Sequence, residues 1–191
     1  GAAPRWMGWA TFALLLALWE VAVRAGWVET RYTASPAEIA VQLQNLVASG
    51  ELWPHLWASL RRLLAGWILG SAAGIAIGLM IGLWRVGRGT LLPLVSALFP
   101  VPKIALLPLF MVWFGIDEGS KVMTILIGTF FPTVIATYAA VDDVDRNLIR
   151  MGQSFGLSSA AIVRKIVLPG AMPGIFAGFR ISISIALTML V

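Results

Sequence analysis

The feature that most constrains the fold is an uncharged apolar segment of 22 residues, residues 63–84. As an α-helix it would be about 33 Å long, enough to cross a hydrocarbon core about 30 Å thick. Four further apolar segments, residues 6–23, 91–114, 122–140 and 174–191, each carry at most one charged residue. The sequence therefore predicts an all-α polytopic membrane protein with about five spans.

Composition supports this class and excludes several others. The chain is 59% hydrophobic and 12% charged, whereas soluble domains carry about 25% charged residues. The net charge of +5 is better explained by basic residues at the cytoplasmic ends of spans than by nucleic-acid binding. Cysteine is absent and His55 is the single histidine. We therefore expect no catalytic residues, no metal site and no nucleic-acid partner.

The connector over residues 24–62 contains a short amphipathic helix. Its sequence, SPAEIAVQLQNLVASG, offers Ser35 as N-cap, Pro36 at the first helical position, Glu38 to complete a capping box and Gly50 as the stop. Its apolar positions share one face. We expect this face to lie on the membrane surface or on a neighbouring span.

Glycine recurs every four residues along the second predicted span. This spacing places the glycines in one stripe, where the backbone of another helix can approach closely. Close packing is the simpler interpretation, and sliding between helices is the alternative. The stripe consists of Gly66, Gly70, Gly74, Gly78 and Gly82.

The third predicted span is interrupted by prolines. The segment FPVPKIALLP cannot form an undisturbed helix, because an interior proline removes a backbone hydrogen bond and clashes with the preceding turn. Irregular backbone at membrane depth is tolerated where it is buried in protein or lines a wet cavity. Pro102 and Pro108 therefore mark this segment as a candidate part of a solute pathway.

Two basic residues fall inside predicted spans, Lys103 near the middle of the third and Arg180 in the fifth. Ionisable groups at membrane depth are functional candidates, and a pathway favouring anionic solutes would use them. The alternatives are structural: Lys103 could snorkel or bind a carbonyl freed at the proline kink, and Arg180 could anchor its helix.

The distribution of basic residues favours a cytoplasmic N-terminus in a bacterial inner membrane. Connector 24–62 is then periplasmic and the polar hairpin 141–173 is cytoplasmic. In this orientation seven basic residues are inside and five outside. The inner set is Arg5, Arg85, Arg88, Arg146, Arg150, Arg164 and Lys165, and the outer set is Arg24, Arg31, Arg61, Arg62 and Lys121.

The hairpin carries a spaced motif: Gly156, then Ile166 ten residues later, then Leu168 and Pro169. This pattern resembles the "EAA" loop of ABC importer permeases, EAA-x3-G-x9-I-x-LP. The segments ASLRRLLAGWILG, VPKIALLPLFMVWFGIDEGSK and LPGAMPGIFAGFR are similar to matching parts of the sulfonate/taurine/nitrate/bicarbonate branch. The resemblance covers residues 6–191 and implies a single type I ABC importer transmembrane domain.

In that family the loop docks on the ATP-hydrolysing subunit, so the resemblance implies an ATPase-coupling hairpin here. The family Glu-Ala-Ala falls on Arg150, Met151 and Gly152, so an acidic residue has become basic. We expect Ser158 or Ser159 to cap a short helix that presents Ile162, Val163 and Ile166 to the ATPase; the plainer alternative is an ordinary interfacial helix. The implied coupling residues are Arg150, Gly152, Ser154, Gly156, Leu157, Ser158, Ser159, Ile162, Arg164, Ile166, Leu168 and Pro169.

The resemblance further implies a non-catalytic permease subunit, and the chain contains no phosphate-binding loop of the Gly-x4-Gly-Lys-Ser/Thr type. ATP and Mg²⁺ would bind to a partner ATPase dimer, a second permease copy would complete the pore, and an extracytoplasmic binding protein would deliver the solute. Family members usually have one more span, which we expect to be missing here. A secondary transporter, or a channel or scaffold without ATP coupling, remains the alternative.

Overall fold

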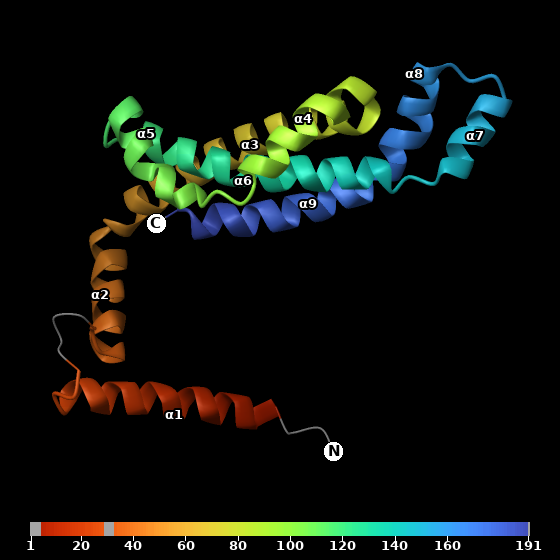
Figure 1. Cartoon of the computed structure of the whole chain (residues 1–191). Coiled ribbons are helices and arrows are strands. Elements are labelled where there is room, and N and C mark those ends of the chain that lie inside the picture. The colour runs from red at the N-terminus through yellow and green to blue at the C-terminus, as the bar shows by residue number, and fades with distance from the viewer. Residues whose placement is uncertain (1–4, 29–32, 191) are drawn as a thin grey trace. The chain divides into compact units, whose positions relative to one another are not determined.

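A computed structural model describes residues 5–28 and 33–190 (Figure 1). Within these ranges every regular element is helical, as expected for an all-α membrane protein. The chain divides into two compact units, Gly1–Trp57 and Ala58–Val191. Arg31, counted above among the outer basic residues, lies outside the described residues.

The first unit contains α1 (Arg5–Arg24) and α2 (Pro36–Ser49). The caps of α2 confirm the sequence prediction. The Ser35 hydroxyl accepts the backbone N–H of Glu38, the Glu38 carboxylate accepts the backbone N–H of Ser35, and Gly50 ends the helix in the left-handed region with φ 79°. No residue of α2 is buried, so its contact with membrane or span stays a prediction.

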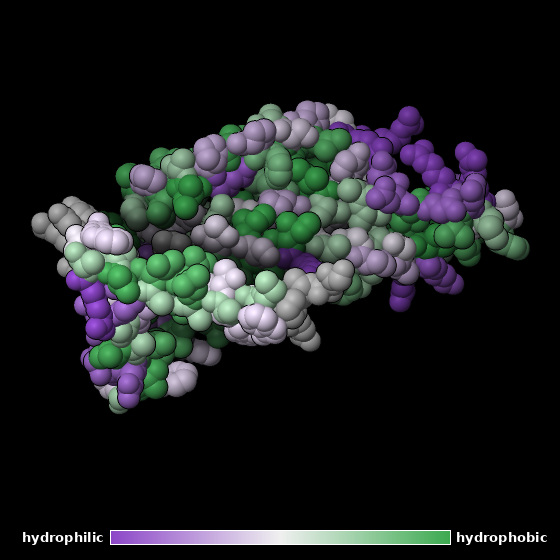
Figure 2. Space-filling view, turned by 90° about the horizontal axis from the view of Figure 1, so that it is seen from below, coloured by the Kyte–Doolittle hydropathy of each residue, from purple (hydrophilic) through white to green (hydrophobic). Residues whose placement is uncertain are grey.

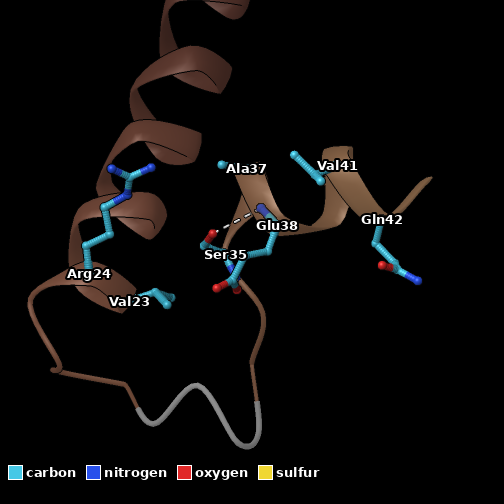
Figure 3. A pocket seen from close by; sticks show the side chains of 7 residues that line it. All are labelled: Val23, Arg24, Ser35, Ala37, Glu38, Val41 and Gln42. Carbon is cyan, nitrogen blue, oxygen red and sulfur yellow. Dashed lines mark hydrogen bonds between the residues drawn. The ribbon is translucent and has the colours of Figure 1, made fainter. Parts of the chain in front are cut away.

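A polar contact joins α1 to the start of α2. The Glu20 carboxylate accepts hydrogen bonds from the Arg24 guanidinium at 2.6 Å and from the backbone N–H of Ala37 at 3.0 Å. The adjoining pocket is lined by residues of both helices, and Figure 3 shows Val23 and Arg24 of α1 beside Ser35 and Glu38. Glu20 is thus paired within its own unit.

The long helix α3 (Leu52–Leu83) begins before the predicted second span. The uncharged segment starts at Leu63, but the helix already includes Arg61 and Arg62. The apolar segment ends at the first charged residues, but charged residues do not end a helix. The helix can begin as early as Leu52 because Pro54 then lies in its first turn, where proline is tolerated. The last part of the predicted connector 24–62 is therefore helical.

The glycine stripe of α3 packs against α6 (Glu118–Asp142). A Cβ atom added at any of its five glycines would lie within 3 Å of α6 atoms, which confirms the predicted close approach. The residue numbers of the contacting partners increase together along α3 and α6, so the two helices run in the same direction. Gly66 faces Ile125, Gly70 faces Thr129, Gly74 faces Thr133, Gly78 faces Thr137 and Gly82 faces Val141.

Between α3 and α6 the chain forms α4 (Arg85–Leu98), a 3-10 turn (Lys103–Leu106) and α5 (Leu107–Phe114). The two helical parts meet at 85°, which confirms that the proline-rich segment cannot be one straight helix. Pro108 lies in the first turn of α5. Arg85 and Arg88, counted above among the inner basic residues, both belong to the first turn of α4. A single residue, Trp84, separates α3 from α4.

The last long helix, α9 (Leu168–Thr188), runs antiparallel to α6. Gly174 lies against Ala140, and Gly178 against Ala136. Helix α9 begins six residues before the predicted fifth span, 174–191, because Pro169 is in its first turn, where proline is tolerated. Two short elements, α8 (Ser159–Ile162) and a π-helical segment (Val163–Val167), lead directly into it.

Arginine–carboxylate pairs fix both ends of α6 to neighbouring helices. The Arg62 guanidinium donates two hydrogen bonds to Glu118, at 2.5 and 2.8 Å. At the other end, Arg88 donates to Asp142 at 2.6 Å and lies over the ring of Tyr138. Paired, charge-assisted contacts of this kind specify geometry, so α6 is held at one end to α3 and at the other to α4.

Candidate functional site

The predicted coupling hairpin forms one end of the second unit. Helix α7 (Arg146–Ser154) and α8 lie beyond the end of the α6–α9 pair, opposite α5 (Figure 1). Hydrophilic residues gather at this end of the molecular surface (Figure 2). Asp145 caps α7 by accepting the backbone N–H of Asn147 at 2.8 Å.

Gly156 makes the turn between α7 and α8. Its φ is +73°, a conformation that favours glycine. The N–H of Leu157 donates to the carbonyl of Gly152, and the N–H of Gly156 donates to that of Gln153. These two bonds form a Schellman motif, the common glycine-terminated end of a helix. The Ser158 hydroxyl then accepts the N–H of Ala161 at 3.3 Å, so Ser158, and not Ser159, caps α8.

The inner side of the hairpin is a small apolar core. Gly152 is buried, and a Cβ there would approach side-chain atoms of Ile166, Ile162 and Leu157 at 2.8, 3.4 and 3.5 Å. Ile162 is 7% exposed and joins a cluster that includes Ala140 of α6 and Ala171 and Ile175 of α9. The Ile162 side chain is therefore on the inner side of the hairpin, where it holds the hairpin to the membrane helices; its part in coupling stays a prediction.

The apolar residues that do face outward lie on α7 and at its C-cap, Phe155. Phe155 is 79% exposed, Met151 55% and Leu148 49%. Their spacing of three and four residues places them on one side of the helix. None of the three is among the coupling residues predicted from the motif, although their helical periodicity is a signal that the sequence carries. The hairpin also carries exposed basic residues: Arg150 next to Met151 on α7, and Arg164 and Lys165 on the π-helical segment.

The remaining hairpin residues divide between surface and junction. Ser154 is exposed and donates its hydroxyl to the carbonyl of Arg150. Ser159 is exposed, Leu168 is half-buried, and Pro169 is exposed in the first turn of α9. The π-helical segment widens the helix by one residue per turn, a feature often found at functional sites. It joins the hairpin to α9 without a loop.

The two basic residues in the predicted spans have different environments. The Lys103 ammonium donates to the carbonyl of Phe99 and to that of Leu98, which also accepts the N–H of Val101. It also lies 4.9 Å from the ring centroid of Phe131. Lys103 therefore caps α4 and stabilises the 85° bend, as the structural alternative for this residue proposed. Pro102 immediately precedes it and caps the 3-10 turn.

Arg180 is exposed on α9 and lines a groove with Ser184 and Thr188. No ion pair of its guanidinium occurs within residues 5–28 and 33–190. In the same part of the chain no cluster of three or more His, Cys, Asp or Glu side chains could hold a metal ion.

Residues 71–191 match the family described as "Binding-protein-dependent transport system inner membrane component". The chain belongs to this family. Permeases of this kind are non-catalytic membrane subunits of ABC importers, and ATP hydrolysis is carried out by their partner ATPase. The family assignment confirms the all-α type I permease fold. Within residues 5–28 and 33–190, four helices together with the bent pair α4–α5 are long and apolar enough to cross a membrane.

Among the relatives of this permease is the putative aliphatic sulfonates transport permease SsuC of Escherichia coli, 43% identical over 93% of this chain and 68% of the relative. The taurine transport permease TauC of the same organism is 33% identical over 95% of this chain and 68% of the relative. The riboflavin transport permease RibX of Chloroflexus aurantiacus is 36% identical over 93% and 66%. The first two belong to the branch that the sequence segments resemble. The permease spans about two thirds of these relatives' length.

Proposed function

We propose that this permease is the translocation subunit of an importer for aliphatic sulfonates or taurine-like anions, coupled to its ATPase through the α7–α8 hairpin. The observation that carries this proposal is the outward apolar patch of α7, Leu148, Met151 and Phe155, beside the glycine-terminated turn. An exposed apolar patch bordered by charges is typical of a protein interaction surface. The twelve coupling residues predicted from the motif divide into those that shape the hairpin and those that surround this patch.

Coupling would work through the core on the inner side of the hairpin. Ile162 packs with residues at the end of α6 and the start of α9, so a force on α7 reaches both helices without passing through a loop. Closure of the ATPase dimer on ATP would move the hairpins of two permease copies and change the tilt of their helix pairs. ATP and Mg²⁺ would stay in the ATPase.

The proposed solute class comes from relatives and from charge. SsuC and TauC are named for aliphatic sulfonates and taurine, and both solute types carry a sulfonate anion. The exposed Arg180 suits an anion, whereas Lys103 is engaged at the bend together with Pro102, and Pro108 starts α5. We therefore retain Arg180 as the pathway residue and assign Lys103, Pro102 and Pro108 to the shape of the pathway wall. Nitrate and bicarbonate are smaller anions of the same charge.

The orientation we propose places the N-terminus and the hairpin in the cytoplasm, with lipid around the spans and a binding protein on the outer face. Helices α3 and α6 run parallel and α9 runs antiparallel to them. With the bent pair α4–α5 crossing between α3 and α6, the directions of these segments alternate as successive spans must. The homodimer is the simplest pore, because one chain supplies one hairpin.

The test is reconstitution of the full-length permease with its ATPase and binding protein in proteoliposomes. We expect uptake of an alkanesulfonate that requires ATP and the binding protein, and co-purification of permease and ATPase. Uptake driven by an ion gradient without ATP would instead support the secondary transporter. Solute flux without ATP, gradient or ATPase association would support the channel or scaffold.

A further inference from the structure

The exposed face of α9 carries a polar stripe. Arg180, Ser184 and Thr188 are four residues apart, so they lie nearly above one another along the helix. All three are exposed and line one groove with Ile181, Ile185 and Met189. The opposite face of α9, with Gly178, Ser182 and Ala186, is buried against the rest of the unit. The stripe is therefore turned away from the described packing of the chain.

The packing of α9 on α6 gives the depth of Arg180. Gly178 lies against Ala136, so in an antiparallel pair Arg180 is level with about Val134. That position is eight residues from Asp142, about 12 Å along the helix, and falls inside the uncharged segment 122–140. Arg180 therefore lies at a depth where an unpaired charge is costly.

The sequence offers no carboxylate to neutralise Arg180 at this depth. Of the nine acidic residues, eight lie outside every predicted span, and the ninth, Glu20, is bonded to Arg24 and Ala37. A second copy of the chain has the same acidic positions and adds none. Arg62 and Arg88, by contrast, each pair with a carboxylate at an end of α6. No carboxylate of the described residues therefore neutralises Arg180 at this depth, and a passing anion would supply the counter-charge.

The two hydroxyls extend this positive site along the helix. Ser184 donates to the carbonyl of Arg180 at 3.1 Å, and Thr188 donates to that of Ser184 at 2.9 Å. Each carbonyl also accepts the regular helical N–H, so either hydroxyl can turn toward an anion without leaving the carbonyl unpaired. Successive donors are about 6 Å apart along the axis.

We propose that Arg180, Ser184 and Thr188 form an anion track on the wall of the solute pathway, which binds the sulfonate group of the solute in transit. This inference rests on the proposed function for its solute and deepens it by naming the residues. Arg180 supplies the charge and a planar set of N–H donors that suits oxyanions. The hydroxyls supply neutral donors, so the anion can move along the track without being held tightly at one step, as conduction requires.

Because the chain contains no cysteine, single cysteines can test whether this face is wet. The experiment compares Ser184→Cys and Thr188→Cys in the full-length permease, assembled with its ATPase in membrane vesicles. Each is treated with a small anionic sulfonate-bearing thiosulfonate reagent and with a cationic reagent of similar size. The control is Ile68→Cys, an exposed apolar position of α3 on the side away from the glycine stripe.

We expect both track cysteines to react, faster with the anionic reagent than with the cationic one, and Ile68→Cys to stay unmodified. Adding Arg180→Gln should abolish the preference for the anionic reagent, while Arg180→Lys should keep part of it. An added alkanesulfonate should slow the labelling. Track cysteines as unreactive as Ile68→Cys, or cross-linked to the second copy on mild oxidation, would overturn the inference and make this face lipid-exposed or an interface between copies.

Uptake in proteoliposomes separates this inference from the proposed function. Arg180→Gln should lower sulfonate uptake about tenfold or more, the value of a lost charge-assisted hydrogen bond, with ATPase association unchanged. Thr188→Val should lower it about threefold. Thr90→Val, which removes a hydroxyl similarly bonded to the carbonyl four residues earlier on α4, should have no effect. If the wild-type protein took up no sulfonate but still showed anion-selective labelling, the proposed solute would be wrong and the anion track would stand.

Discussion

At Gly70 a single absent carbon atom sets the distance between α3 and α6. A Cβ there would lie 2.5 Å from the carbonyl oxygen of Leu126, a backbone atom that cannot rotate away. Gly70→Ala should therefore separate the helices and destabilise the protein by about 1–3 kcal/mol, the usual cost of overpacking. The measurement is the thermal midpoint of the purified permease in detergent.

The matched control is Gly89→Ala on α4, where a Cβ would meet nothing within 4 Å. Because alanine is the better helix former, this change should leave the midpoint unchanged or raise it slightly. If both variants had the same thermal midpoint, the glycine stripe would not be a packing surface.

Gly156 tests the backbone rather than the packing. No atom lies within 4 Å of a Cβ built there, but the residue has φ +73°. Gly156→Ala should cost about 1 kcal/mol through backbone strain alone. Gly156→Asn should cost less, because asparagine tolerates this conformation. We expect ATPase affinity to follow the same order, measured by co-purification at increasing salt; equal affinities for wild type, Gly156→Asn and Gly156→Ala would remove the turn from the coupling mechanism.

At the scale of the element, the hairpin exposes one face, which we propose docks the ATPase, and packs the other against the membrane helices. Phe155→Ala should weaken ATPase association about tenfold, as loss of a central aromatic contact does, and leave the thermal midpoint unchanged because Phe155 is 79% exposed. Ile162→Ala should act mainly on stability: it should lower the free energy of unfolding by about 2–5 kcal/mol, since Ile162 is buried.

Thermal unfolding and a pull-down on the same two variants separate these effects. If Phe155→Ala lowered the midpoint as much as Ile162→Ala, α7 would pack inside the isolated permease and would not be the docking face.

The hairpin also shows what local sequence can predict. The caps of α2 at Ser35, Glu38 and Gly50 were predicted correctly because each signal lies within a few residues of the bond it makes. The inward orientation of Ile162 was not, because it depends on Gly152 and on the distant ends of α6 and α9. Likewise, hydropathy located the core of α3 but missed its first turns, since charge ends an apolar segment without ending a helix.

For the whole molecule, the parallel pairing of α3 with α6 fixes the order of crossings. Because α3 and α6 run in the same direction, the chain must return across the membrane between them. The segment α4–α5 therefore crosses the membrane despite its 85° bend. The exposed Ile116, between α5 and α6, and the exposed Gln153 on α7 must then lie on opposite sides of the membrane, because α6 crosses between them. If α4–α5 were a re-entrant loop, α3 and α6 could not both cross in the same direction.

The absence of cysteine makes this topology measurable. In intact cells, Ile116→Cys should react with a membrane-impermeant maleimide and Gln153→Cys should not; in inside-out vesicles the pattern should reverse. Reaction of Gln153→Cys from outside would place the hairpin in the periplasm, out of reach of any ATPase. The expected pattern would instead place the hairpin in the cytoplasm, where ATP is available. The solute would then enter at the opposite end of the helices, where Arg62 of α3 pairs with Glu118 of α6.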